Sequence, residues 1–217
     1  MAPKNLKKGL FITFEGIEGC GKSTHSKLLY EHLMKQGYSP ILTREPGGTA
    51  LGEGIRKILL DSKGLDISDV SEFLLFEAAR SQIVKEVIMP ALKRGRIVIS
   101  DRFSDATVAY QGYGNGLDLT TIKRVDDIAS MGLKPGITIL LDIKTRLGLG
   151  RAREKGTDRI EARAIAYHRR VRAGYLALAK KDRKRIRVVR VKGSIKATQD
   201  LVRREVSCAV QGYKRSG

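Results

Sequence analysis

Segments with the apolar pattern of a strand alternate with segments that have the pattern of a helix along the whole chain. The central strand candidates are continuous apolar runs, as expected where helices cover both faces of a sheet. The pattern predicts strands at residues 10–14, 40–43, 96–100, 137–142 and 187–191. It predicts helices near residues 22–36, 51–60, 71–89, 119–131, 162–181 and 195–211, with Pro90 closing the third of them. This alternation is typical of an α/β fold, and we expect a five-stranded parallel sheet flanked by helices in a single domain over residues 1–217.

Three polar segments follow directly after predicted strands. They are residues 15–24 after the first strand, residues 44–49 after the second, and the pair Asp101-Arg102 after the third. Because ligands of such sheets bind beyond the carboxyl ends of the strands, we expect these segments to meet at one site.

The size and composition of the chain restrict its class. A chain of 217 residues is long enough for one well-buried domain and short for two. It contains no run of 18 apolar residues, and its basic start leads into a predicted strand and not into a signal-peptide core, so we expect a cytoplasmic protein without a membrane span. Cys20 and Cys208 match no metal or redox spacing, which agrees with that location.

The net charge of +19 is distributed unevenly. Residues 1–142 contain 19 Lys and Arg against 17 Asp and Glu, whereas residues 143–217 contain 23 against 6, so the last third carries +17. A basic face of this kind is able to bind nucleic acid or another acidic surface. The chain has no recognisable nucleic-acid module and few aromatic residues for stacking, so we expect instead a solvated basic surface with several arginines gathered around phosphates.

The strongest motif is a phosphate-binding loop at residues 16–23. Gly16, Gly21, Lys22 and Ser23 fit the pattern G-x-x-x-x-G-K-[ST] at every fixed position, and a predicted strand and helix flank them as the motif requires. The glycines let successive backbone N–H groups point at one anion, and we expect Lys22 to reach the β- and γ-phosphates of a nucleoside triphosphate while Ser23 ligates Mg²⁺. The predicted nucleotide site comprises Gly16, Ile17, Glu18, Gly19, Cys20, Gly21, Lys22, Ser23 and Thr24.

Two further groups place charge at the same edge of the sheet. Arg102 is able to hold a second phosphate bidentately, and Asp101 is able to order Mg²⁺ or its waters. The turn at residues 44–49, Arg-Glu-Pro-Gly-Gly-Thr, brings Arg44 and Glu45 to the same side. A surface Asp-Arg pair and a plain turn are the alternatives, and the position after strands favours a ligand role.

Two segments away from the strand ends complete the candidate site. Phe76 and Arg80 are four residues apart and share one helix face, so the ring is able to stack on a base while the guanidinium hydrogen-bonds to its edge. Residues 150–161, between the fourth predicted strand and a long predicted helix, contain several arginines together with two glycines. Arginines on a mobile lid neutralise the charge that develops in phosphoryl transfer, although a solvated helix end also explains the cluster.

Taken together, these motifs resemble the thymidylate kinase family over nearly the whole chain. The resemblance rests on Phe-Glu-Gly-Ile-Glu-Gly at 14–19 before Gly-Lys-Ser-Thr at 21–24, Arg-Glu-Pro-Gly-Gly-Thr at 44–49, Phe76 to Arg80, Asp-Arg-Phe with Ala-Tyr-Gln-Gly within 101–112, and Asp-Arg-Ile-Glu at 158–161. Residues 168–176 are similar to the family too. The resemblance implies a P-loop nucleoside-monophosphate-kinase-like fold, a short lid at about 148–161, ATP-dependent phosphorylation of dTMP to dTDP, and a homodimer.

The resemblance also implies roles for single residues in holding dTMP. Glu18 would contact the deoxyribose 3′-hydroxyl with Glu45 nearby, and Tyr110 would crowd the 2′ position. Phe76 would stack on thymine and Arg80 would hydrogen-bond to its edge, with Thr107 and Gln111 completing recognition of the base. Arg102 and Arg56 would hold the acceptor phosphate.

The source of the catalytic cations follows from the same resemblance. The phosphate-binding loop contains no arginine, so the chain is similar to the branch that takes its arginines from the lid, here Arg151 and Arg153. They would act together with Lys22, Arg102 and Glu18.

Two positions depart from the family pattern. Ala106 stands where many relatives have Ser, and Phe103 replaces a frequent Tyr, but neither change removes a group that the reaction requires. Two alternatives stay open, namely another nucleotide or deoxynucleoside kinase and a non-catalytic P-loop module that binds nucleic acid through the basic last third.

Overall fold

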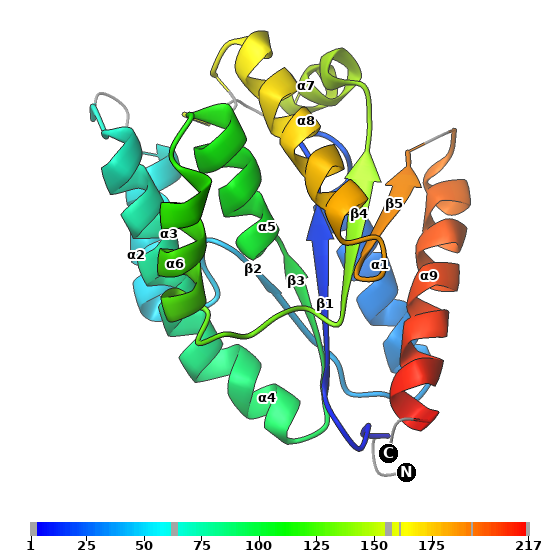
Figure 1. Ribbon diagram of the computed structural model, residues 1–217. Coiled ribbons are helices and arrows are strands. Elements are labelled where there is room, and N and C mark those ends of the chain that lie inside the picture. The colour runs from blue at the N-terminus through cyan, green and yellow to red at the C-terminus, as the bar shows by residue number, and fades with distance from the viewer. Residues whose placement is uncertain (1–3, 62–64, 155–157, 161, 192, 216–217) are drawn as a thin grey trace.

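The five predicted strands form one parallel sheet, which the computed structural model shows in the order β2-β3-β1-β4-β5 (Figure 1). The structure describes residues 4–61, 65–154, 158–160, 162–191 and 193–215. The strands are β1 (Leu10–Glu15), β2 (Ile41–Arg44), β3 (Ile97–Asp101), β4 (Ile137–Asp142) and β5 (Ile186–Arg190). Each strand begins and ends within about one residue of its predicted bounds, which confirms the α/β fold.

Strand β1 lies at the centre of the sheet between β3 and β4. Leu10 pairs with Ile97 of β3, and Ile12 pairs with Ile137 of β4. All side chains of β1 are buried. Since successive side chains of a strand point to opposite faces, a strand that is buried throughout is covered on both sides. Figure 1 shows these covers, with α8 (Ile165–Lys181) in front of the sheet and α1 (Lys22–Lys35) behind it.

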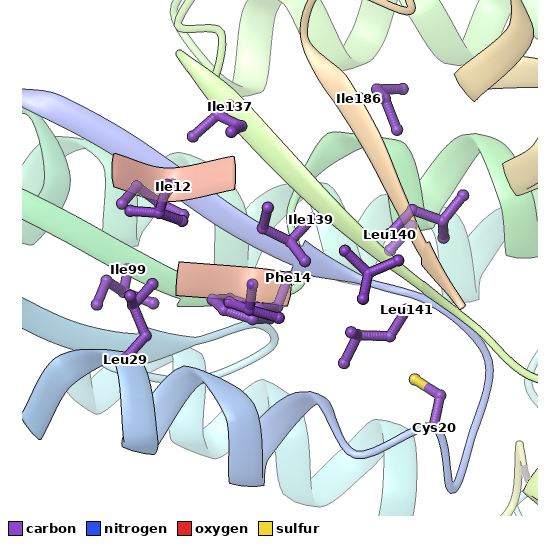
Figure 2. Packing of buried hydrophobic residues seen from close by; sticks show 14 of the residues in the cluster. Ile12, Phe14, Cys20, Leu29, Ile99, Ile137, Ile139, Leu140, Leu141 and Ile186 are labelled. Atoms are coloured by element: carbon purple, nitrogen blue, oxygen red, sulfur yellow. The ribbon is translucent and has the colours of Figure 1, made fainter. Parts of the chain in front are cut away.

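Apolar side chains of the central strands form the main core together with α1. Ile12 and Phe14 of β1, Ile99 of β3 and Leu29 of α1 belong to one cluster and are fully buried, and Figure 2 shows Leu29 next to Ile99. Full burial of each such side chain contributes about 1.5–3 kcal/mol. This cluster therefore fixes the strand and the helix whose junction carries the phosphate-binding loop.

The remaining helices follow the predicted order. Ser68 caps α3 and Asp118 caps α6, because each side chain accepts the backbone N–H three residues later. Among the described residues, no helix combines the length and the apolar character that a membrane crossing needs. The bounds are α2 (Ala50–Asp61), α3 (Asp69–Ile83), α4 (Met89–Lys93), α5 (Ser104–Thr107), α6 (Leu119–Ala129), α7 (Thr145–Arg153) and α9 (Ile195–Arg215).

The prediction that Pro90 closes the third helix is wrong. Helix α3 continues through the π-helical segment η1 (Val84–Ile88) into α4, which ends at Lys93. The N–H of Met89 bonds to the carbonyl oxygen of Val84, five residues earlier. The wider π-helical turn accommodates a proline that has no N–H to donate, so the helical path continues beyond it.

Two helical segments have no counterpart in the predicted elements. One comprises α5 and the π-helical segment η2 (Val108–Gly114), and the other is α7. Both contain glycines, and η2 is also rich in aromatic and β-branched residues, so their intrinsic helix propensity is low. Packing stabilises η2 instead, since a Cβ atom at Gly174 of α8 would lie 2.7 Å from the ring of Tyr113.

Candidate active site

The phosphate-binding loop leaves β1 at Glu15 and enters α1 at Lys22. Gly16, Gly19 and Gly21 have φ angles of 138°, 66° and 95°, which glycine adopts without steric cost. The Lys22 amine donates to the backbone carbonyl oxygens of Gly16 at 3.0 Å and Ile17 at 3.1 Å. The ammonium group therefore lies over the loop, close to the positive N-terminus of α1, as an anion-binding site requires.

Helix α7 packs directly on this loop through two glycines. A Cβ atom at Gly19 would lie 1.9 Å from the carbonyl oxygen of Gly148, and a Cβ atom at Gly148 would lie 2.5 Å from the carbonyl oxygen of Glu18. Neither distance is compatible with a side chain. The start of the predicted lid is thus in backbone contact with the nucleotide loop, a feature that the sequence shows only as an unexplained glycine.

A cavity of about 320 Å³ opens at the carboxyl ends of β1, β2 and β3. Its volume suits a small-molecule ligand. All nine side chains that the sequence assigned to the substrate line this cavity. The lining residues are Glu18, Lys22, Ser23, Arg44, Glu45, Pro46, Arg56, Leu60, Phe76, Arg80, Asp101, Arg102, Ala106, Thr107, Tyr110, Gln111, Asp158 and Ile160.

Ser23 and Asp101 are in direct contact on the wall of the cavity. The Ser23 hydroxyl donates to Asp101 Oδ2 at 2.6 Å. Hydroxyl and carboxylate oxygens suit Mg²⁺, which is usually held by one or two protein groups, by phosphates and by water. The described part of the chain contains no group of three or more His, Cys, Asp or Glu side chains that is able to hold a metal alone. The pair therefore fits a Mg²⁺ ion that arrives with a nucleotide.

Glu18 is buried among hydrogen-bond donors. Its Oε1 accepts from the Tyr110 hydroxyl and from Arg102 Nη2 at 3.2 Å, while its Oε2 lies 3.1 Å from His168 Nδ1. Burial acts to raise the pKa of this carboxyl, but the hydrogen bond with His168 and the charges of Arg102 and Lys22 outweigh it and lower the pKa to about 2. Glu18 is therefore ionised at neutral pH.

Arg102 is fixed by its backbone and by aromatic rings. Its φ angle is 76°, which is uncommon for a residue other than glycine and occurs often at functional sites. Its N–H donates to the carbonyl oxygen of Phe14 at 2.9 Å. The guanidinium lies 4.7 Å from the centre of the Tyr110 ring and donates to the Tyr175 hydroxyl at 3.2 Å. The positive charge is thus held beside the phosphate-binding loop.

Arg80 is 2% exposed and lies among three carboxylates. Its Nε and Nη2 both lie 2.9 Å from Glu45 Oε2, and its Nη1 donates to Glu77, to Asp126 at 3.0 Å and to the Thr107 hydroxyl at 2.9 Å. Burial raises the pKa of Glu45 to about 7, against the opposing effect of the Arg80 charge. The guanidinium is therefore immobilised at the cavity wall before any ligand binds.

Three other predicted substrate residues also have defined surroundings. Phe76 is only partly buried on α3, so part of its ring is accessible from the cavity. Arg56 donates to the carbonyl oxygen of Pro46 at 2.9 Å. Gln111 is buried, and its Nε2 donates to Glu72 Oε1 at 3.0 Å. Each of them lines the cavity from a different helical segment.

The predicted lid at about 148–161 begins as a helix. Arg151 and Arg153 lie on the last turn of α7, where both side chains are exposed and neither lines the cavity. Residues 155–157 and 161 of this prediction lie outside the described residues. Asp158 and Ile160 line the cavity. The structure therefore brings the end of the lid to the cavity and leaves the two arginines in solvent.

The sequence motifs assign no role to two polar groups on α8 that support the site, although both lie within the segment 168–176 that resembles the family. His168 is fully buried against Glu18, and the Tyr175 hydroxyl donates to Glu15 Oε2 at 2.7 Å. The two residues are seven apart with Val171 between them, and this spacing places all three on one buried helix face. The sequence signal that could have revealed them is the presence of two polar residues, His168 and Tyr175, on an otherwise apolar helix face.

A parallel sheet in this order, with a phosphate-binding loop after the central strand and Arg102 after its neighbour, defines a P-loop kinase of the nucleoside monophosphate type. The family model described as thymidylate kinase matches residues 14–202, and the chain belongs to the thymidylate kinase family.

Individual relatives agree with this assignment. A thymidylate kinase of Geotalea daltonii is 50% identical over 189 residues, covering 83% of this chain and 88% of the relative. A thymidylate kinase of Roseiflexus castenholzii is 46% identical over 221 residues, covering 95% of each chain. The crystal structure of a thymidylate kinase from Ehrlichia chaffeensis matches with a TM-score of 0.77 and 36% identity, covering 92% of this chain and 99% of that one.

Proposed function

We propose that the chain transfers the γ-phosphoryl group of ATP to the 5′-phosphate of dTMP, giving dTDP and ADP. The observation that carries the proposal is one cavity that is lined by Lys22 and Ser23 of the phosphate-binding loop, by the Phe76 and Arg80 pair, and by Arg102. Two phosphate-binding features and a base-binding pair in a single cavity fit a reaction between two nucleotides.

The donor nucleotide is expected at the loop. Backbone N–H groups of residues 16–24 and the Lys22 ammonium group bind its phosphates. Ser23 and Asp101, which are in contact, would hold Mg²⁺. When bound, the ion neutralises charge on the β- and γ-phosphates. Binding of ATP redirects the Lys22 ammonium from the carbonyl oxygens of Gly16 and Ile17 to phosphate oxygens, which are stronger acceptors.

The acceptor nucleotide is expected in the part of the cavity that Phe76 and Arg80 line. Phe76 offers its accessible ring face to thymine, and the immobilised Arg80 and Gln111 lie beside the base edge. The phosphate of dTMP is held by Arg102 and Arg56. Glu18, Glu45, Thr107 and Tyr110 surround the sugar and base, and the Tyr110 hydroxyl bonded to Glu18 narrows the space for a 2′-hydroxyl group.

The chemistry needs positioning more than proton transfer. An oxygen of the dTMP phosphate forms a bond to the γ-phosphorus while the bond to the β–γ bridging oxygen breaks, and ADP departs with that electron pair. The acceptor phosphate is ionised near pH 7, so no strong general base is required. Lys22 and Arg102 neutralise the developing charge, and we expect the exposed side chains of Arg151 and Arg153 at the end of α7 to add to this by turning toward the phosphates.

A coupled assay of ADP release tests the proposal. The acceptors are dTMP, dUMP, dCMP, dAMP, dGMP and thymidine, each with ATP and Mg²⁺. We expect the highest kcat/KM with dTMP. A preference for a purine nucleotide or for thymidine would assign the chain to a different kinase class, and no ADP release with any acceptor would contradict the proposal.

A gel-shift titration with DNA and RNA at rising salt tests the nucleic-acid alternative. Binding that weakens with a log-log slope of about −0.9 for each phosphate neutralised would support that alternative. We expect no such shift, because the chain has no recognisable nucleic-acid module and few aromatic residues for stacking on bases. A homodimer and a cytoplasmic location remain predictions from the sequence.

A further inference from the structure

Glu72 of α3 is a fully buried carboxylate outside every motif described above. Its Oε1 accepts from Gln111 Nε2 at 3.0 Å and from Asn115 Nδ2 at 3.3 Å. Its Oε2 accepts from Arg163 Nη2 at 2.8 Å and from Arg159 Nη2. A carboxylate has about four acceptor sites, so four donors from η2, from the residue after it and from the segment before α8 fill them.

This arrangement determines the orientation of the Gln111 side chain. An ionised carboxylate accepts hydrogen bonds and donates none, so only the NH₂ end of the Gln111 amide is able to face Glu72. The amide is planar, and its carbonyl oxygen therefore points away from Glu72. Gln111 lines the cavity beside Arg80 and Thr107, so the cavity is the space into which this acceptor is directed.

We propose that Glu72 is a positioning residue that sets base specificity, because it orients the Gln111 carbonyl oxygen to accept a hydrogen from ring nitrogen N3 of the base. This inference rests on the proposed function and adds a residue to it. Thymine and uracil carry a hydrogen on N3, whereas cytosine has a lone pair there. A carbonyl oxygen fixed in this orientation forms a hydrogen bond with thymine or uracil, but it stays without a hydrogen-bond partner when cytosine is bound.

The same carboxylate joins the base pocket to the end of the lid. Arg159 lies between Asp158 and Ile160, which both line the cavity, and its Nε donates to the carbonyl oxygen of Leu59 at 3.0 Å. Removing Glu72 therefore affects two structures at once, and the test has to separate base recognition from a loosened lid.

Glu72→Gln is the informative substitution. Its side-chain amide donates as well as accepts, so it permits both orientations of the Gln111 amide while keeping the size of Glu72. We expect the ratio of kcat/KM for dTMP to kcat/KM for dCMP to fall about tenfold. The ratio for dTMP to dUMP should stay unchanged, because both bases carry the hydrogen on N3 and differ only in a methyl group.

Two further variants distinguish the proposal from a general loss of structure. Arg163→Gln removes the contact of Glu72 with the segment between the lid and α8 and leaves its bond with Gln111, so it should raise KM without changing the dTMP to dCMP ratio. In a Gln111→Ala background, Glu72→Gln should have no further effect on that ratio. Thermal melts verify that each variant is folded, and Glu72→Asp, whose carboxylate is drawn back from Gln111, replaces Glu72→Gln if the latter does not fold.

The results that would contradict the role of Glu72 differ from those that would contradict the proposed function. An unchanged dTMP to dCMP ratio in a folded Glu72 variant overturns the inference, as does an equal fall of that ratio in Arg163→Gln. Failure of the wild-type protein to use dTMP would instead contradict the proposed function, because that result does not depend on Glu72.

Discussion

Charged side chains at the cavity have partners before any ligand binds, and some of these partners are neutral groups that a ligand is able to replace. Lys22 shows this most clearly, since its ammonium group contacts two backbone carbonyl oxygens of the loop. An ammonium group attracts an ionised phosphate oxygen by opposite charge, whereas a backbone carbonyl oxygen offers it only a dipole. The unliganded loop thus keeps the lysine in place without competing strongly with a nucleotide.

Substitution of Lys22 by Ala is expected to abolish most of the activity and to leave the fold intact. The loss of transition-state stabilisation should be about 2–5 kcal/mol, a fall in kcat/KM of roughly 30- to 5000-fold. Steady-state kinetics with dTMP and a thermal melt measure both effects. Lys27→Ala, an exposed lysine on the same helix, is the control and should behave like the wild type. Near-normal turnover of Lys22→Ala would exclude the loop from catalysis.

The buried Glu18 carboxylate predicts a pH dependence of stability. Its pKa in the folded protein is about 2, below the value of 4.5 expected for an unfolded chain. The unfolded state therefore takes up the proton first as the pH falls, so ionised Glu18 stabilises the fold above pH 4.5, and this contribution is lost between about pH 4.5 and 2. The full contribution of ionised Glu18 to the free energy of unfolding is about 3 kcal/mol.

Urea denaturation of wild type and Glu18→Gln measures this contribution. The difference between their free energies of unfolding should be constant above about pH 5 and should shrink at lower pH. A difference that grows on acidification would show that Glu18 is not stabilised as a carboxylate.

At the residue scale, the sequence predicted which residues line the cavity better than it predicted which side chains contact one another. The loop motif and the strand ends led to side chains that line the cavity, because their positions follow from the topology of a parallel sheet. The contacts of Glu72 and His168 were not predicted, since their partners Gln111 and Glu18 are 39 and 150 positions away. Only the tertiary packing of α3 and α8 brings these pairs together.

At the scale of elements, the contact between α7 and the phosphate-binding loop links the lid to the nucleotide site. The backbone of Gly148 touches both Gly19 and Glu18, so α7 and the loop are able to shift only together. This contact explains why a segment with low helix propensity is a helix, since its position is fixed by close packing.

Gly148→Ala is expected to disrupt this contact. A Cβ atom 2.5 Å from the carbonyl oxygen of Glu18 forces the helix away from the loop, and we expect a loss of about 1–3 kcal/mol in the free energy of unfolding together with a lower kcat. Gly150→Ala is the matched control on the same helix. Beyond its own helix, no atom of the described residues lies within 4 Å of a Cβ atom there, so that variant should be neutral or more stable by about 0.5–1 kcal/mol. Equal effects of both changes would refute a role for the contact.

The exposed Arg153 at the end of α7 is expected to act on the transition state. Arg153→Ala should lower kcat far more than it weakens dTMP binding, because its charge is needed only when the phosphoryl group moves. Arg146→Ala, also exposed on α7 but at its start, serves as the control. Single-turnover kinetics together with dTMP titration separate the two effects, and a change confined to dTMP affinity would place Arg153 in ground-state binding.

Helices and strands were predictable where the periodicity of apolar residues agreed with the residues that begin and end such elements. The strands and the long helices followed from apolar runs and capping residues. The path through Pro90, η2 and α7 did not, because a π-helical turn and a glycine-rich helix depend on what packs against them and leave no periodic pattern.

For the whole molecule, helices α2, α3 and α6 form a flank that lies to the left in Figure 1 and carries exposed apolar side chains. Ile128 of α6 is 78% exposed and Leu74 of α3 is 50% exposed, and Leu51, Ile58 and Val70 are also exposed on α2 and α3. A flank of this kind favours association with a second copy of the chain, in line with the homodimer that the sequence resemblance implies.

Sedimentation equilibrium tests the dimer. Wild type should sediment as a dimer, and Leu74→Glu should shift it toward monomer, because an ionised side chain in the centre of an apolar contact is left without a partner. Val188→Glu introduces the same charge on β5 at the opposite edge of the sheet and should leave the dimer intact. A monomeric wild type at micromolar concentration would contradict the prediction.

The central position of β1 has a consequence for how the protein is made. Its partners lie far along the chain, at Ile97 for Leu10 and at Ile137 for Ile12. Closing such long loops delays the formation of a parallel sheet relative to a helical bundle. On the ribosome, β1 is synthesised early but acquires its second neighbour only when β4 has emerged. The loop that follows β1 is therefore translated well before the strands on both sides of β1 are in place, and it is able to bind a nucleotide only after they have paired.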